Sequence, residues 1–308
     1  MPPMNRRRLL QATSSFSALS PLAALQAAEE EFAISYVLSS ALYGDMKLEA
    51  ILPEVERSGS IGLDIWGKPH GTQREEVNEM GVEAFAALLA KHGAKLTVST
   101  RYPLGPFGLQ PEMPFLKELG GSLLVCGATK PAQPEGEEAK KAVADFLEKM
   151  KPHADAAGEH GLVIAVENHS GNLLYHPDSL RYWAELNDHP ALGVAFAPHH
   201  LHAFIPEIPG LIRDLGDEQL PFIYFQEYGI GSKKTVAKEI ELEQLPGRGT
   251  LDYRPLVSAL REIAFSGVAE IFMHPTPRGV PMLEEATAIT DTINESRAYI
   301  DRCLAETA

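Results

Sequence analysis

Residues 137–167 read EEAKKAVADFLEKMKPHADAAGEHGLVIAVE, and this stretch decides the fold class. Its first part, 137–160, has apolar residues at helical spacing and charged residues on the opposite face, which predicts an amphipathic helix. The apolar residues are Val143, Phe146, Leu147 and Met150. Its last part, 162–167, is apolar at consecutive positions up to Glu167, which is typical of a strand buried on both faces. A helix followed by such a strand indicates a parallel sheet covered by helices.

The same alternation runs through the rest of the chain. Short apolar runs bounded by turn residues predict eight strands, at 33–38, 61–66, 96–100, 123–126, 162–167, 192–196, 222–226 and 269–273. Helical periodicity predicts helices at 48–57, 75–92, 137–160, 177–186, 252–264 and 284–304. An open doubly wound sheet would usually carry a glycine-rich phosphate turn after its first strand, whereas 38–45 contains Gly44 alone. We therefore expect an α/β fold, the (β/α)8 TIM barrel.

The length and the net charge of the chain limit the number of domains and the kinds of partner that we expect. The 308 residues are 44% hydrophobic and 22% charged, as in globular proteins, and barrels of about 250 residues commonly form one domain. One barrel domain spanning 31–308 is expected. The net charge of −15 leaves no basic surface for a phosphate backbone, so nucleic acid is not expected as a partner. Two cysteines, Cys126 and Cys303, are too few for a disulfide framework and are expected to be ordinary thiols.

The first 28 residues differ from the rest of the chain. Three arginines, Arg6 to Arg8, precede two leucines, a weakly apolar stretch rich in Ala and Ser, and then an acidic run. This order resembles a twin-arginine signal peptide at 1–28, an address for export of folded proteins; a disordered basic arm is the alternative. No later apolar run approaches the length that spans a bilayer. We expect an exported, periplasmic protein with no membrane segment in its mature form.

Polar residues near the carboxyl ends of the predicted strands are the candidates for chemistry, because side chains there converge on one mouth of a barrel. They are Asp64, Trp66, His70, Arg101, Lys130, Glu167, Asn168, His169, His199, His200, Gln226, Glu227, Glu270 and His274. Two longer connections, 101–114 and 228–251, also follow strands on this face. They are expected to form either a lid or rim over the mouth or variable surface loops.

Two carboxylates stand out among these candidates. Glu167 completes an apolar run and would be costly to bury without a partner. Period-two alternation puts Glu270 and His274 on one side of the last strand and apolar residues on the side that suits the outer helices. Two inward carboxylates on different strands can transfer protons across a substrate or bind a hard divalent cation. The alternative for each is an ion pair with a neighbouring cation such as Arg101.

Four segments carry a resemblance to a known family. They are VIAVENHSGN (163–172), VAFAPHHL (194–201), PGRGTLDYRPL (246–256) and EIFMHPTPRG (270–279). In this order and spacing they resemble the sugar phosphate isomerase/epimerase family, the TIM barrels related to xylose isomerase and endonuclease IV. The resemblance covers most of the chain after residue 30.

The resemblance implies a divalent metal, Mn, Mg, Co or Zn, held by a Glu, an Asp, a His and a second Glu on successive strands. Glu167 and Glu270 match the first and fourth ligands. The second falls at Ala197, which has no ligand atom, and the third falls near Tyr224. Half of the usual ligand set is therefore missing, and Gln226 or His274 is a candidate replacement.

The chemistry that the resemblance implies is enolisation of a small carbohydrate, in which a carboxylate removes a proton beside a carbonyl and an enediolate forms. Glu167 and Glu270 are expected to transfer protons, with His200 orienting substrate hydroxyls. The expected substrate-binding residues are Trp66, His70, Arg101, Asn168, His169, Gln226 and His274. Export and the lack of a clear phosphate cradle favour a free or oxidised sugar.

Three other functions stay open at this point. The first is a lyase or hydrolase acting on keto-sugars on the same fold, and the second is a sugar-binding protein that has lost catalysis. The third, the endonuclease branch, needs more histidines and acids than the sequence supplies and is opposed by the acidic charge. A homo-oligomer is compatible with the sequence, which does not specify the oligomeric state.

Overall fold

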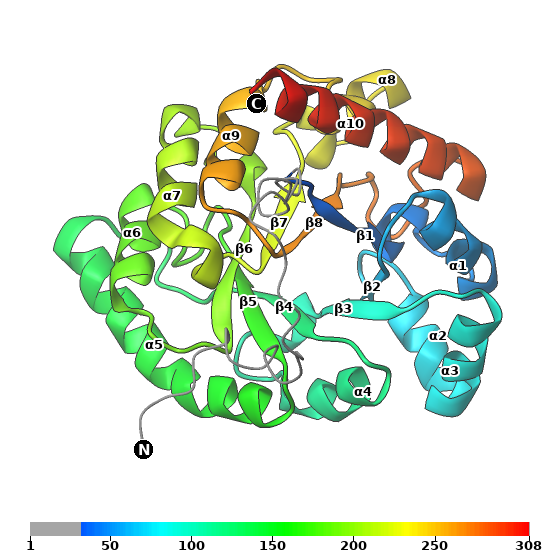
Figure 1. The fold of residues 1–308 in the computed structure, drawn as a ribbon, viewed down its shortest axis with the longest axis horizontal. Helices are drawn as coiled ribbons and strands as arrows, with labels where there is room; N and C mark the ends of the chain where they lie inside the picture. The colour runs from blue at the N-terminus through cyan, green and yellow to red at the C-terminus, as the bar shows by residue number, and fades with distance from the viewer. Residues whose placement is uncertain (1–31, 308) are drawn as a thin grey trace, which may run out of the picture. The chain divides into compact units, whose positions relative to one another are not determined.

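The computed structural model describes residues 32–307, so the expected signal peptide at 1–28 lies outside the described residues. Eight parallel strands close into a barrel in the order β1 to β8, with β8 pairing back to β1 (Figure 1). The strands are β1 Ser35–Ser39, β2 Leu63–Trp66, β3 Leu96–Thr100, β4 Leu123–Gly127, β5 Val163–Glu167, β6 Leu192–Phe196, β7 Phe222–Phe225 and β8 Val268–Ile271. The expected (β/α)8 TIM barrel is confirmed.

Helices form a ring outside the strands (Figure 1). They are α1 Leu48–Arg57, α2 Gln73–Met80, α3 Val82–Lys91, α4 Met113–Glu118, α5 Gly136–Glu159, α6 Pro177–Leu186, α7 Ile208–Gln219, α8 Lys238–Glu241, α9 Arg254–Glu262 and α10 Ala286–Glu306. The apolar face of α5 that the sequence predicts is buried in the structure, Val143 and Met150 completely. No helix of residues 32–307 combines the length and the apolar character that crossing a membrane requires.

Three helical segments differ from the sequence prediction. The single helix expected at 75–92 is two helices, because Gly81 has a φ of 89° and interrupts the helical hydrogen bonding between α2 and α3. The short α4 begins inside the connection expected at 101–114. No helix was predicted where α7 forms, a segment that contains Pro209 and a non-helical Gly216.

Parallel register brings the carboxyl ends of the strands to one level. Glu167, the last residue of β5, pairs with Gly127 on β4 and Ala195 on β6. Because β-strand side chains alternate, the inward residues at these ends face a common mouth. Both cysteines are buried and free, as expected.

The connection 228–251 is anchored to the barrel rather than loose. Gln244 is completely buried, accepts hydrogen bonds from Gln226 Nε2 and the His274 backbone N–H at 3.1 Å each, and donates from Nε2 to the His274 carbonyl at 3.1 Å. Glu227 accepts from the backbone N–H groups of Gly247 at 3.3 Å and Leu251 at 2.8 Å. These buried polar contacts make the segment a fixed rim of the mouth.

Candidate functional site

The main cavity, about 590 Å³, opens at the carboxyl ends of the barrel strands. It is lined by Pro69, His70, Tyr102, Gly105, Pro106, Gly127, Ala128, Thr129, Glu167, His169, Asn172, His274 and Arg278. These residues belong to the ends of β4 and β5 and to the connections after β2, β3, β4, β5 and β8. TIM-barrel enzymes place their active sites on this face, and the volume is typical of a small-molecule site.

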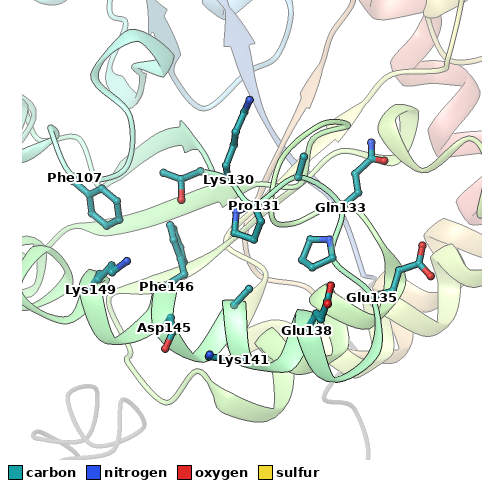
Figure 2. A pocket seen from close by; sticks show the side chains of 14 residues that line it. Phe107, Lys130, Pro131, Gln133, Glu135, Glu138, Lys141, Asp145, Phe146 and Lys149 are labelled. Carbon is teal, nitrogen blue, oxygen red and sulfur yellow. The ribbon is translucent and has the colours of Figure 1, made fainter.

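Two further cavities adjoin the main cavity. A side cavity of about 150 Å³ shares His169, His274 and Arg278 with it and reaches His200 and Gln226. An outer cavity of about 640 Å³ lies along the first turns of α5, outside the mouth (Figure 2). Thr129 lines both the outer and the main cavity.

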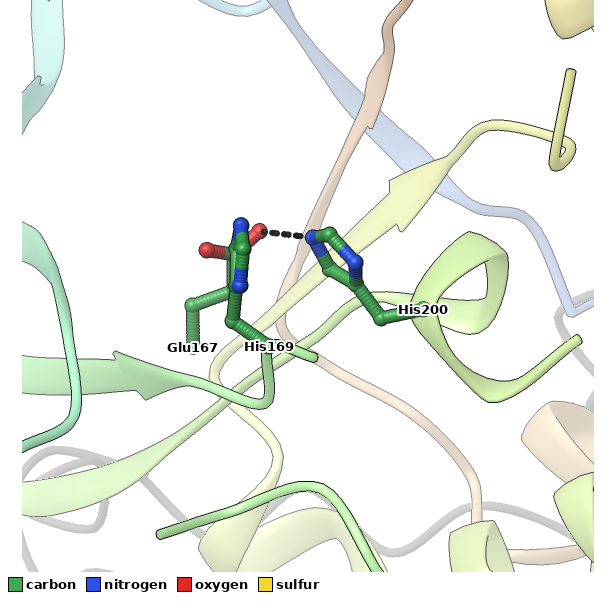
Figure 3. A group of neighbouring side chains, drawn as sticks. All are labelled: Glu167, His169 and His200. Atoms are coloured by element: carbon green, nitrogen blue, oxygen red, sulfur yellow. Dashed lines mark ion pairs between the residues drawn. The ribbon is translucent and has the colours of Figure 1, made fainter. Parts of the chain in front are cut away.

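Glu167, His169 and His200 form a compact cluster, in which one ligand atom from each lies within 4.8 Å of the others. His200 Nε2 points at Glu167 Oε1 at 3.8 Å, and the rings of His169 and His200 are 3.8 Å apart between centroids (Figure 3). Glu167 is 4% exposed. The cluster brings together three residues that the sequence indicated as separate candidates. They lie at or just after the ends of two neighbouring strands.

Ser170 holds both imidazoles of the cluster. His169 Nδ1 lies 2.6 Å from the Ser170 carbonyl oxygen, which can only accept, so Nδ1 carries a proton and donates it in this hydrogen bond. His200 Nδ1 contacts the Ser170 hydroxyl at 3.4 Å. His200 Nε2 is buried and has no hydrogen-bond partner among residues 32–307. Imidazoles fixed through one nitrogen present the other to a proton or a metal.

Burial controls the charge state of the cluster. It raises the pKa of the Glu167 carboxyl to about 7, although His169 and the Tyr102 hydroxyl oppose this shift. Burial, helped by the neighbouring His199, holds the pKa of His200 well below its usual range. A neutral imidazole therefore stands beside a carboxyl that exchanges its proton near neutral pH.

Arg278 supplies a cation at the mouth, and the sequence analysis did not nominate it. Its guanidinium donates from Nη1 to the Pro275 carbonyl at 2.9 Å and from Nη2 to the Ser232 carbonyl at 3.0 Å. Burial and then the charge of Arg278 lower the pKa of His70 to about 4, so this cavity histidine is neutral. The sequence signal for Arg278 was its place in the segment 270–279, one of the four that carry the family resemblance, four residues after His274.

Glu270 does not line the main, side or outer cavity, whereas Glu167 lines the main cavity. It is completely buried inside the barrel beside Asp64, whose Oδ2 accepts a hydrogen bond from Thr100 Oγ1 at 2.6 Å. Burial and then the charge of Asp64 raise the pKa of Glu270 well above its usual range. The predicted roles of Glu270 in proton transfer and metal binding stay predictions.

Trp66 and Arg101 also lie outside the three cavities. We expected Trp66 to offer a wall to a sugar ring, but Phe272 stacks on it at 4.9 Å with 11° between the planes. Arg101 Nη1 lies 3.9 Å from Glu112 Oε1, a carboxylate that the sequence analysis did not consider. Protein groups therefore contact both side chains where a substrate was expected.

Asn168 is completely buried, and its side-chain amide is hydrogen-bonded to the backbone of Ala197. Asn168 Oδ1 accepts from the Ala197 N–H at 2.7 Å, and Nδ2 donates to the Ala197 carbonyl at 3.0 Å. Asn168 thus ties the end of β5 to the end of β6. Gln226 lines the side cavity, with Nε2 bonded to Gln244 and Oε1 without a hydrogen-bond partner in the described chain.

The structure also places Ala197 and Tyr224, the two positions that the resemblance assigned to the remaining ligands. Ala197 is completely buried and has no ligand atom. The Tyr224 hydroxyl lies 3.1 Å from the Tyr102 hydroxyl, and Tyr102 in turn lies beside Glu167.

Comparison with solved structures shows the same fold in proteins of low sequence identity. The IolI protein with a bound zinc atom is 18% identical with a TM-score of 0.67, covering 89% of this chain and 99% of its own. D-psicose 3-epimerase with D-tagatose from Clostridium cellulolyticum H10 is 15% identical with a TM-score of 0.64, covering 88% and 99%. The 3-keto-D-glucoside 4-epimerase from E. coli is 18% identical with a TM-score of 0.59, covering 86% and 100%.

A comparison with curated proteins gives no match. A family model described as a xylose isomerase-like TIM barrel matches residues 54–299, which is most of the barrel. The expected resemblance is thereby confirmed. This chain belongs to the xylose isomerase-like TIM barrel family.

Proposed function

We propose that the protein is a sugar isomerase or epimerase that moves a proton beside a sugar carbonyl through an enediolate. The observation that carries this proposal is Glu167, a buried carboxyl with a pKa of about 7 that lines the main cavity. A group whose pKa lies near the working pH can accept a proton and return it. The solved structures of D-psicose and D-allulose epimerases with bound sugars support a small carbohydrate as the ligand.

Four cavity residues have distinct parts in this mechanism. Glu167 removes the proton beside the carbonyl, and the adjacent Tyr102 hydroxyl orients its carboxylate. The fixed guanidinium of Arg278 stabilises negative charge on the enediolate oxygens. His70 lines the same cavity and is neutral, so it can hydrogen-bond a hydroxyl group of the sugar.

A divalent metal fits the cluster Glu167, His169 and His200 better than the usual family positions. Two imidazoles and a carboxylate are a common ligand set, and the unpartnered His200 Nε2 is the kind of buried atom that a cation would satisfy. The bound zinc atom of the IolI structure is consistent with this proposal. When bound, such a cation would polarise a sugar oxygen and add positive charge to the site.

We expect His200→Ala to weaken binding of Zn²⁺ or Mn²⁺ by about 100-fold or more. Loss of a residue that only supports a ligand weakens metal binding by about 10–100-fold, and loss of the ligand itself should weaken it more. Isothermal titration of the metal-stripped protein measures this change. His160→Ala is the matched control, since His160 caps α5 at the opposite end of the barrel. Equal affinities in the wild type and His200→Ala, or no stoichiometric binding of Mn, Mg, Co or Zn, would contradict the metal proposal.

The proposed reaction is tested by NMR in deuterated water with D-fructose, D-tagatose and D-psicose, each with and without the four metals. Proton transfer through an enediolate should put solvent deuterium on the carbon beside the carbonyl and leave the carbon skeleton intact. Cleavage of the sugar would indicate the lyase or hydrolase alternative instead.

A sugar-binding protein without turnover is the second candidate. The specific observation in its favour is that Glu270, one of the two expected proton-transfer groups, lies outside the main cavity. Saturable sugar binding with no deuterium exchange under any of the four metals would support this function over the isomerase.

We further propose export to the periplasm, on the basis of Arg6, Arg7 and Arg8 and the segment that follows them. Expression of the full chain in a bacterium with a twin-arginine pathway should yield periplasmic protein whose amino terminus begins near residue 28. Replacing Arg6, Arg7 and Arg8 with lysine should keep it in the cytoplasm with residue 1 retained. Equal export of both forms would contradict the proposal.

A further inference from the structure

The outer cavity and the main cavity share one lining residue, Thr129, and hydrogen bonds fix the segments between them. The Leu173 N–H donates to the Thr129 carbonyl at 2.8 Å, and the Gln133 N–H donates to the Asn172 carbonyl at 2.9 Å. Asn172 itself lines the main cavity. The connection after β4 is thereby held against the connection after β5, so the two cavities keep one relative position. With about 640 Å³, the outer cavity is large enough for a small-molecule group of its own.

An aromatic ring forms part of the outer cavity. Phe107 is 39% exposed, unusual for a large apolar residue, and its ring packs against Phe146 at 5.8 Å and His153 at 5.5 Å between centroids. In Figure 2, Phe107 and Phe146 lie at one end of the cavity, and the Lys130 side chain extends away from the other labelled side chains. An exposed aromatic ring supported from behind offers a flat apolar surface, which suits the C–H face of a sugar ring.

The charges around the outer cavity balance. Three lysines and three carboxylates line it: Lys130, Lys141, Lys149, Glu135, Glu138 and Asp145. A cavity that bound phosphate or a sugar acid would need an excess of cations. Balanced donors and acceptors beside an aromatic surface favour a neutral, hydroxyl-rich ligand.

We infer that the outer cavity is a subsite for a second sugar unit, so that the preferred substrate is a neutral disaccharide or another glycoside. The reacting ring occupies the main cavity and the linked unit crosses Thr129 to lie on Phe107. The position of the reacting ring rests on the proposed function. A single free sugar would occupy the main cavity and leave the outer one to water.

Binding of D-fructose is compared with that of three glucosyl-fructoses, turanose, maltulose and isomaltulose, which carry glucose on O3, O4 and O6. Isothermal titration of the full barrel should show at least one disaccharide binding about tenfold more tightly than D-fructose. Phe107→Ala should remove this advantage and leave D-fructose binding unchanged. Ala142→Trp, which narrows the cavity from α5 and leaves residue 107 a phenylalanine, should also remove the advantage and leave D-fructose binding unchanged. Ile61→Ala, an exposed apolar change two residues before β2, is the control and should change neither affinity.

The inference is overturned if no disaccharide binds more tightly than D-fructose, or if the advantage survives both Phe107→Ala and Ala142→Trp. Deuterium exchange separates this result from the proposed function. If D-fructose exchanges deuterium but no disaccharide is preferred, the subsite is contradicted and the proposed function is not. Phe107-dependent disaccharide binding without exchange in any sugar supports the subsite and contradicts the isomerase.

Discussion

Replacing Glu167 with glutamine is expected to lower the rate of deuterium exchange into the sugar by about 10²–10⁴-fold, the usual contribution of a positioned general base. Glutamine keeps the shape of the side chain and its contact with Tyr102 but cannot accept a proton. Because Glu167 is also a proposed metal ligand, both proteins are compared at metal concentrations that saturate each of them. Arg278 and His70 remain in place, so sugar affinity should then change by no more than a few fold. Exchange rates by NMR at saturating metal, with affinity from titration, separate the loss of proton transfer from a loss of binding.

Glu262→Gln is the matched control for this experiment. Glu262 has the same side chain and pairs with Arg213 on the exposed outer surface, at 2.6 Å from Oε2 to Nε. This variant should exchange at the wild-type rate. If Glu167→Gln also exchanges at the wild-type rate, another group removes the proton and the mechanism proposed for Glu167 is wrong.

The barrel could be predicted from the sequence because its strands are buried on both faces. Runs such as 162–167 and 192–196 have no polar interruption, and the observed β5 and β6 lie within one residue of the predicted bounds. Helices that break the simple pattern were harder to predict. Gly81 divides one predicted helix into two, and α7 forms although Pro209 and Gly216 lie in it, because packing on the barrel outweighs local propensity.

The functional site could be predicted only in part. The alternation of side chains along a strand shows which of them point into the barrel, but not how far below the mouth they lie. The alternation correctly predicts that Glu270 points into the barrel. It cannot show that the Glu270 side chain lies beside Asp64, which is two strands away around the closed sheet. The stacking of Phe272 on Trp66 is likewise a contact between the ends of two different strands. Arg278 lies in a connection whose path depends on hydrogen bonds to Ser232, which no local pattern reveals.

Replacing Glu270 with glutamine is expected to make the protein more stable than the wild type above pH 7. Burial raises the pKa of both Glu270 and Asp64, so the folded protein holds protons that the unfolded chain has already released. The free energy of unfolding therefore falls as pH rises, by about 1.4 kcal/mol per pH unit for each proton held. This contribution is fully present below the unfolded-state pKa of about 4 and is lost as pH rises through the folded-state pKa.

The test compares the two proteins between pH 7 and 9, because the histidines with lowered pKa are the same in both and their contribution to the slope cancels in the difference. These are His70, His199, His200 and His274. Urea unfolding at pH 7, 8 and 9 should show Glu270→Gln gaining about 1–3 kcal/mol over the wild type by pH 9. Glu262→Gln should keep the wild-type slope, because Arg213 lowers the pKa of Glu262 and the group is ionised throughout this range. Parallel curves for the wild type and Glu270→Gln would mean that the buried carboxyl is already charged, and a charged Glu270 would again be a candidate base for the reaction.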